Sequence, residues 1–405
     1  MIRACRVTPL LIVALVAAAA APDAGGAPRE VRGLWVVRTA LSSPASVSAM
    51  VAAARGAGVN TLIVQVRGRG DAYYASRFEP RPSALASQPA SFDPLAAVLR
   101  EARAAGLAVH AWVNVNLVAD AGDPPAHPRH VVNRHPEWLM VPMELAASIG
   151  APRGPRFVRT LASWTRSQSA TVEGLFTSPM SEGAADHLAS VVQDLVARYA
   201  VDGVHFDYVR YPGESFDYSR QALLAFRAEV ARELTRQDRE ALDRKRRLNP
   251  LVWTQKYPQR WEAYRRARLT ALMRRLRGVV LRHRPKAVVS AAVVPDAQTA
   301  VALKYQDWPS WAADGVLDAL CPMTYATDLA VFRQQVESVR SAARGRPVWA
   351  GIGAYRLSAE EALRQIREAR ALGVDGVLLF SYDSLISPAR GLGNLSRIGA
   401  QAFGQ

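Results

Sequence analysis

Apolar residues along the chain form short runs that alternate with amphipathic helical patterns. Three stretches share one design, in which a helical pattern ends at a glycine and an apolar run follows: AAARGAGVNTLIVQV, EARAAGLAVHAWVN and EARALGVDGVLLFSY. Glycine readily takes the left-handed conformation that ends many helices, so each stretch predicts a helix C-terminus and then a strand. A fourth stretch, VARYAVDGVHFDY, repeats the design with alanine in place of the glycine.

These apolar runs lack a clean polar alternation, which predicts strands buried on both faces of a parallel sheet. Eight such runs occur, with helical patterns between them. They begin near Val31, Thr61, Ala108, Gly203, Ala287, Leu317, Val348 and Gly376. Several begin about 30 residues apart, the size of one strand–helix unit. We therefore predict an α/β fold, a (β/α)8 TIM barrel, rather than a doubly wound open sheet, because no glycine-rich phosphate loop follows an early strand.

Two of the connections are much longer than the others. Residues 115–183 follow the third predicted strand and show little regular pattern, whereas residues 213–283 follow the fourth and are helical and very basic. Both insertions leave the C-terminal ends of strands, the face on which TIM barrels build their active sites. We expect them to form the walls of a cleft.

The fourth predicted strand ends in polar groups, within the stretch VDGVHFDYVRYPG. Alternate residues of a barrel strand point inward. His205 and Asp207 share one parity, and Val204 and Phe206 have the other. We therefore expect the apolar pair to face the helices and Asp207 to reach the mouth of the barrel.

Other predicted strands also end in polar or aromatic side chains, which together suit a sugar. Amides, imidazoles and guanidinium groups bind hydroxyls or carboxylates, and aromatic faces stack on pyranose rings. The candidate substrate-binding residues are Gln65, Arg67, Asp71, His110, Trp112, Asn114, His205, Arg210, Asp296, Tyr325 and Tyr382. Core packing is the alternative role for the tryptophans on the strands, and a hydrogen-bonded structural role is the alternative for His205.

Carboxylates at such a mouth can protonate a glycosidic oxygen or attack the anomeric carbon. Asp207 is the leading catalytic candidate and Asp383, after the last strand, is the first choice for its partner; Asp71 and Asp296 follow. Apolar neighbours raise a carboxyl pKa and favour a general acid, whereas Arg210 favours the charged form of Asp207. Because apolar neighbours outnumber this single arginine, we predict that Asp207 is the general acid.

A metal site is the alternative reading of the same region. His110, His205 and Asp207 lie on adjacent predicted strands and could converge as ligands. No close His-x-His pair supports this arrangement. We predict neither a metal nor another cofactor.

The chain has 405 residues, half of them apolar, which is ample for one large domain. Its formal net charge of +16 favours a polyanionic partner, although a solvated basic surface would give the same balance. Without the N-terminal segment, Cys321 is the one remaining cysteine. We expect no internal disulfide and a buried, unreactive Cys321.

The N-terminus has the pattern of a secretory signal peptide. Arg3 and Arg6 precede an apolar run from Leu10 to Ala21, and small residues follow. We predict a signal peptide over residues 1–27 and a barrel domain over residues 28–405. Export to the periplasm argues against nucleic acid as the partner and favours an acidic polysaccharide or an anionic membrane surface. We expect no integral membrane segment in the mature chain.

The ordered motifs RGLWV, NTLIVQVRGRGDAYY, GLAVHAWVN, HPEWL, DGVHFDYVRYP, LDALCPMTY, GIGAYR and GVLLFSYD cover residues 30–390. This set resembles the glycosyl hydrolase-like family 10 proteins, the bacterial barrel proteins formerly called DUF187. The resemblance implies a TIM barrel, glycosidase activity and a leading role for Asp207. It also implies kinship with exported enzymes that cleave peptidoglycan strands stripped of their stem peptides.

Two features depart from the expected pattern. The segment TLASWTRSQSATVEGLFTSP is less family-like than its flanks, and the seventh strand ends GIGAY without a carboxylate. We predict an exported glycoside hydrolase of a polymeric, anionic cell-wall glycan. The alternatives are a glycan-binding barrel without turnover and a metal-dependent polysaccharide hydrolase or deacetylase.

Overall fold

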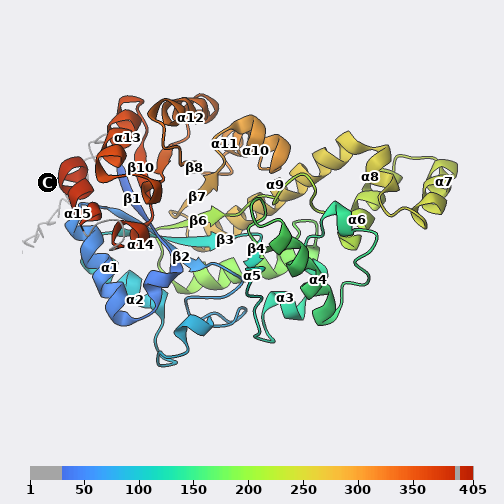
Figure 1. The fold of residues 1–405 in the computed structure, drawn as a ribbon, viewed down its shortest axis with the longest axis horizontal. Coiled ribbons are helices and arrows are strands. Elements are labelled where there is room, and N and C mark those ends of the chain that lie inside the picture. Colours follow the sequence, from blue (N-terminus) through green and yellow to red (C-terminus); the bar gives the residue numbers. More distant parts are fainter. Residues whose placement is uncertain (1–29, 388–392, 405) are drawn as a thin grey trace, which may run out of the picture.

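A computed structural model describes residues 30–387 and 393–404, so the predicted signal peptide lies outside the described residues. Eight parallel strands close into a barrel in the order β1-β10-β9-β8-β7-β6-β3-β2, which confirms the predicted TIM barrel (Figure 1). The strands are β1 (Val31–Val36), β2 (Thr61–Arg67), β3 (Ala108–Asn114), β6 (Gly203–Asp207), β7 (Val288–Val293), β8 (Ala319–Thr324), β9 (Trp349–Ile352) and β10 (Gly376–Phe380). Each of the eight apolar runs forms one barrel strand.

Helices cover the outside of the barrel (Figure 1). They are α1 (Pro44–Gly56), α2 (Pro94–Ala104), α5 (Glu182–Arg198), α9 (Pro258–His283), α10 (Ala297–Leu303), α11 (Trp308–Ala313), α12 (Leu329–Ala342), α13 (Ala359–Ala371), α14 (Tyr382–Leu385) and α15 (Asn394–Ile398). Capping residues in the sequence determine where several of these helices begin. The Asp93 side chain accepts a hydrogen bond from the Ala96 N–H at the start of α2, and Ser358 and Glu361 form a capping box at the start of α13.

The two long insertions form folded structure beyond the C-terminal ends of the strands (Figure 1). The first contains β4 (Leu117–Ala119), α3 (Val131–Arg134), α4 (Gly154–Ser167) and β5 (Leu175–Phe176). It has an apolar cluster of its own, which includes Val132, Phe157 and Leu161, although its sequence showed little regular pattern. The second contains α6 (Arg220–Ala231), α7 (Arg236–Arg246) and α8 (Val252–Lys256), and then continues into α9.

Short turns of tighter or wider helix complete the fold. They are η1 (Arg38–Leu41), η2 (Ser83–Leu85), η3 (Pro136–Trp138), η4 (Met143–Leu145), η5 (Ala354–Arg356) and the π-helical η7 (Gly399–Phe403). Within the described residues, no helix combines the length and the hydropathy needed to cross a bilayer.

The barrel interior is a separate apolar cluster, formed by Trp35, Ile63, Trp112, Ala319, Cys321, Trp349 and Leu378. Val204 and Phe206 instead pack in the larger core between strands and helices, as their parity predicts. Cys321 is fully buried, and burial raises the pKa of its thiol. The tryptophans on β1, β3 and β9 therefore fill the barrel interior.

Candidate active site

A pocket of about 220 Å³ opens at the mouth of the barrel. It gathers side chains from the ends of β1, β2, β3, β6, β8 and β10. The predicted residues that line it are Gln65, Trp112, Asn114, Asp207, Arg210 and Tyr325. Residues that sequence reasoning did not select also line it, among them Trp35, Arg38, Arg69, Tyr208 and Phe380. Asp207 is the one carboxylate among the described residues of this lining.

Asp207 is the last residue of β6, directly opposite Asn114 in the parallel register with β3. Its residue surface is 6% exposed. Tyr208 has a positive φ of 51°, and its backbone N–H donates to Asp207 Oδ1 at 2.6 Å. Burial raises the pKa of Asp207, and this effect outweighs the opposing influence of Arg210 and of the Tyr208 N–H. The carboxyl group therefore holds its proton to higher pH than an exposed aspartate does.

Arg210 lies between two carboxylates. Its Nη1 is 3.5 Å from Asp207 Oδ1, and its Nη2 is 2.9 Å from Glu173 Oε1. The guanidinium also lies over the Tyr208 ring, 4.2 Å from the centroid. Nη1 is buried and has no hydrogen-bond partner in the described part of the chain. Arg210 thus retains a donor beside Asp207 that a ligand oxygen could accept.

Glu173 is an acidic residue that pairs with Arg210, does not itself line the pocket, and was not selected from the sequence. It lies just before β5 in the first insertion, and its side chain is 36% exposed. Its negative charge contributes to the raised pKa of Asp207, which indicates that the two carboxylates interact. No periodic pattern marks Glu173, because it is in a connection rather than at the end of a barrel strand.

Aromatic side chains form one wall of the pocket. Tyr325 and Phe380 are stacked with ring centroids 5.4 Å apart, and Trp35 packs edge-on to Phe380 at 5.9 Å. Trp112 Nε1 donates to Asn114 Oδ1 at 2.8 Å, which fixes both side chains at the end of β3. Flat aromatic faces beside fixed polar groups are suited to sugar rings.

Basic side chains form the other wall. Arg38 Nη1 donates to Gln65 Oε1 at 3.0 Å, which places Arg38 across the end of β2. Burial and the neighbouring Arg38 both lower the pKa of Arg69. Three guanidinium groups (Arg38, Arg69 and Arg210) therefore surround a pocket whose lining holds one carboxylate. The pocket is electrostatically suited to an anionic ligand.

His205 and His110 lie inside the barrel, below the pocket. Trp35 Nε1 donates to His205 Nε2 at 3.3 Å, so Nδ1 carries the proton and faces Ser290 Oγ at 3.0 Å. Burial and the nearby His110 lower the pKa of His205 to about 3, and burial lowers that of His110 to about 4. Both rings are therefore neutral at neutral pH, and neither lines the pocket. Over residues 30–387 and 393–404, no three His, Cys, Asp or Glu side chains gather into a metal site.

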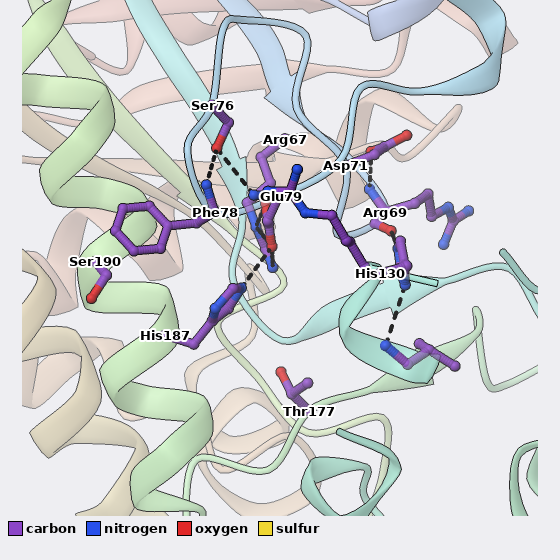
Figure 2. A network of polar contacts seen from close by, with 12 residues as sticks. Arg67, Arg69, Asp71, Ser76, Phe78, Glu79, His130, Thr177, His187 and Ser190 are labelled. Carbon is purple, nitrogen blue, oxygen red and sulfur yellow. Dashed lines mark hydrogen bonds and ion pairs between the residues drawn. The ribbon is translucent and has the colours of Figure 1, made fainter. Parts of the chain in front are cut away.

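Arg67 is placed in a buried ion pair rather than in the pocket lining (Figure 2). Its Nε donates to Glu79 Oε2 at 2.8 Å, and Glu79 Oε1 is also 3.3 Å from His187 Nε2. Arg67 Nη1 donates to the carbonyl oxygen of Asn114. Burial would raise the pKa of Glu79, but Arg67 and His187 override it and lower the pKa to about 2. Arg67, at the end of β2, is thus held by Glu79 and in turn contacts the last residue of β3.

The structure does not bring the remaining predicted residues into the pocket. Asp71 Oδ1 accepts from the Arg69 N–H at 3.0 Å in a turn, and Asp296 caps α10 through the Thr299 N–H at 2.7 Å. Asp383 lies in the first turn of α14, where it accepts from Thr39 Oγ1 at 2.7 Å and from the Val37 N–H at 3.3 Å. Tyr382, in the same helix, is buried.

Comparison with known proteins gives curated relatives for part of the chain. "Glycosyl hydrolase DigH" of Escherichia coli (strain K12) is 28% identical over 162 residues, which are 38% of this chain and 33% of that protein. "Glycosyl hydrolase YngK" of Bacillus subtilis (strain 168) is 25% identical over 160 residues, 38% of this chain and 26% of that protein. The matched region thus spans about a third or less of these relatives.

Solved structures share the fold over nearly the whole chain. The glycoside hydrolase domain of PgaB (BpsB) from Bordetella bronchiseptica has a TM-score of 0.61 and 16% identity, covering 90% of this chain and 98% of that one. The β-galactosidase from Bacillus circulans sp. alkalophilus has a TM-score of 0.62 and 13% identity, covering 93% of this chain and 56% of that one. At this level of identity the likeness is one of fold.

The sequence profile of the family described as Glycosyl hydrolase-like 10 matches residues 30–355, which is most of the chain and includes every residue of the pocket except Phe380. The resemblance inferred from the ordered motifs is confirmed. The chain belongs to the glycosyl hydrolase-like 10 family.

Proposed function

We propose that this protein is an exported glycoside hydrolase that cleaves a polymeric, anionic cell-wall glycan, such as peptidoglycan strands without their peptides. The main support is Asp207, a buried carboxyl group with a raised pKa at the mouth of a barrel. Family membership and the fold of solved glycosidases support the reaction class. A TIM barrel alone supports many chemistries, so the site is the stronger argument.

Asp207 acts as the general acid in this proposal. A glycosidic oxygen placed against the aromatic wall would receive its proton as the bond to the anomeric carbon breaks. Because burial raises its pKa, Asp207 keeps that proton to higher pH than an exposed aspartate would. The free Nη1 donor of Arg210 then stabilises the carboxylate that forms after proton transfer.

Glu173 is our proposal for the second carboxylate. Its ion pair with Arg210 Nη2 holds it on the same guanidinium that faces Asp207, and over a third of its side chain is open to solvent. It could therefore activate a water molecule as a base or attack the anomeric carbon as a nucleophile, the two roles that the second carboxylate of a glycosidase can take. Both oxygens of Asp383, the partner expected from sequence, already accept hydrogen bonds from the segment after β1.

The three guanidinium groups around the pocket support an anionic substrate. Peptidoglycan strands without peptides expose lactyl carboxylates, which Arg38, Arg69 or Arg210 could pair with. Export, and therefore access to the periplasmic cell wall, rests on the N-terminal sequence pattern alone. We propose this location together with the substrate.

Digestion of purified peptide-free glycan strands tests the proposal. We expect new reducing ends and shortened fragments by mass spectrometry, and far fewer of both from the Asp207→Asn variant. Strands that bind the wild-type protein but are never cut would favour a glycan-binding barrel without turnover. Activity abolished by EDTA and restored by a divalent metal would favour a metal-dependent hydrolase or deacetylase.

A further inference from the structure

A second and larger hollow lies between the two insertions, outside the site described above. Its volume is about 650 Å³, within the range of pockets that hold small organic ligands. One side comes from the first insertion, around η3, η4 and α4. The other side comes from α6 and from the link between α7 and α8. Figure 1 shows α4, α6, α7 and α8 beyond the C-terminal ends of the barrel strands. We call this hollow the insertion groove.

The walls of the insertion groove are mainly aliphatic. Leu139, Val141 and Ile149 line it from the first insertion, and Leu223 and Leu224 line it from α6. Sugar sites present flat aromatic faces beside hydrogen-bonding groups, as the pocket at the barrel mouth does. Branched aliphatic side chains are instead suited to a chain of methylene groups. The insertion groove therefore fits a lipid acyl chain better than it fits a glycan.

The rim of the insertion groove is basic. Arg220, Arg246 and Arg247 line it. The side chains of Arg220 and Arg247 make no ion pair or hydrogen bond within the described part of the chain. Arg246 is 3.7 Å from Asp243, but its buried Nε has no hydrogen-bond partner in the described part of the chain. These guanidinium groups have donors free for an anionic head group.

One apolar side chain stands out beside this rim. Leu248 directly follows the basic run from Arg244 to Arg247, and it is 94% exposed. Leu224, on the facing helix α6, is 38% exposed. Exposed leucine beside clustered basic residues is the composition of protein surfaces that insert shallowly into anionic bilayers. An acidic peptide helix would fit the charge, but it would leave the protruding Leu248 without an apolar environment.

We propose that the insertion groove docks the protein on an anionic membrane. An acyl chain of a phospholipid would enter between Leu139 and Leu224, the phosphate would pair with Arg246 and Arg247, and Leu248 would insert beside it. This inference is independent of the proposed glycosidase activity, because none of these residues lines the pocket at the barrel mouth.

Co-sedimentation of the whole protein with lipid vesicles tests the proposal. We expect binding to vesicles of equal parts phosphatidylglycerol and phosphatidylcholine, and much weaker binding to phosphatidylcholine alone. The double variant Leu224→Asp/Leu248→Asp should lose at least tenfold in affinity for the anionic vesicles. A matched control is Leu303→Asp on α10, where the leucine is 40% exposed away from the groove, and it should bind as the wild type does.

Charge is tested with a second matched pair. Arg246→Gln/Arg247→Gln should weaken binding by roughly fivefold for each arginine, which is the usual contribution of a basic residue at an anionic bilayer surface. Arg100→Gln/Arg103→Gln removes the same charge from exposed positions on α2 and should have a smaller effect. Melting temperatures and circular dichroism spectra like those of the wild type would show that the groove variants fold.

Three results would overturn the proposal. Equal loss from the α2 and groove arginine pairs, with no effect of the leucine changes, would mean that net charge alone attracts the vesicles. A dimer in analytical ultracentrifugation that Leu224→Asp/Leu248→Asp dissociates would assign the groove to a second copy of the chain. Tighter binding of an acidic amphipathic peptide than of the vesicles would assign it to a protein partner.

Discussion

At the scale of single residues, the site buries a carboxyl group in surroundings that disfavour its charged form. Asp207 is buried, and the influence of Arg210, the Tyr208 backbone N–H and the Trp112 side chain, which all favour its charged form, does not offset the effect of burial. Such a group lowers stability when it ionises, because a buried charge is solvated poorly. Active sites commonly accept this cost in exchange for a carboxyl group that keeps its proton near neutral pH.

The Asp207→Asn variant should lose about 10² to 10⁴-fold in turnover, which is the usual contribution of a general acid. An aryl glycoside with a good leaving group needs little protonation, so the variant should recover much of its rate on that substrate. Steady-state kinetics on both substrates would measure the two effects. Near wild-type turnover of the natural glycan by Asp207→Asn would remove Asp207 from the mechanism.

The same substitution should stabilise the fold at neutral pH. Because the folded pKa of Asp207 is raised above its usual 3.8, folding favours the protonated form. The favourable contribution is complete below pH 3.8 and is lost as the pH rises through the folded pKa. Asn cannot ionise, so the difference in free energy of unfolding between Asp207→Asn and wild type should grow with pH. Urea unfolding from pH 4 to 8 would measure it; a constant difference would contradict a raised pKa.

Glu173 and Asp383 can be separated as candidates for the second carboxylate. We expect Glu173→Gln to lower turnover by a factor comparable with the Asp207 variant, and Asp383→Asn to retain turnover but unfold at lower temperature. Asp383 accepts two hydrogen bonds that tie α14 to the segment after β1, each with a net contribution of about 1 kcal/mol. Kinetics together with melting temperatures would decide, and the reverse pattern would restore the assignment made from sequence.

At the scale of elements, the alternation of residues predicted the direction of side chains within a regular strand, but it did not apply beyond the end of the strand. The parity argument placed Asp207, Trp112 and Asn114 correctly because β3 and β6 continue to those residues. It failed for Asp383 because β10 stops at Phe380 and the chain turns into α14. It could not find Arg69 or Glu173, because both lie in connections whose conformation depends on tertiary contacts.

Another element-scale feature is the buried pair of Arg67 and Glu79, which joins the end of β2 to the following loop. The sequence pattern placed Arg67 at the end of a strand, but it did not reveal that Glu79, twelve residues later, is its partner. Removing one member of a buried pair leaves an uncompensated charge. Glu79→Gln should therefore destabilise the protein by about 3–5 kcal/mol.

The pair also gives wild-type stability a defined acid dependence. The folded pKa of Glu79 is about 2, below its usual 4.5. Its stabilising contribution is therefore complete above pH 4.5 and declines as the pH falls toward 2. Acid titration of the unfolding free energy should show this decline in wild type and a shallower one in Glu79→Gln. Parallel curves for the two proteins would contradict the lowered pKa.

At the scale of the whole molecule, the positive charges that make up the net charge of +16 fall into two groups, those on the surface and those at the pocket. Many surface arginines pair with acidic residues, as Arg236 does with Glu240 and Arg275 with Asp186. Such exposed pairs contribute little to stability. Arg38 and Arg69, in contrast, face the pocket at the barrel mouth. A long-range attraction by the whole surface and a short-range attraction by the pocket should therefore respond differently to salt.

We expect kcat/KM on an anionic glycan to fall as sodium chloride is raised from 10 mM to 1 M. Over about this range the screening length shortens from roughly 30 Å to 3 Å, so long-range attraction disappears and contacts inside the pocket persist in part. The same glycan with its carboxylates amidated should show a flat response. The Arg38→Gln variant should lower kcat/KM on the anionic glycan at every salt concentration. The Arg100→Gln variant, at an exposed position on α2, should lower kcat/KM only at low salt. An equal salt response of the anionic and amidated glycans would show that the positive charge of the protein does not select its substrate.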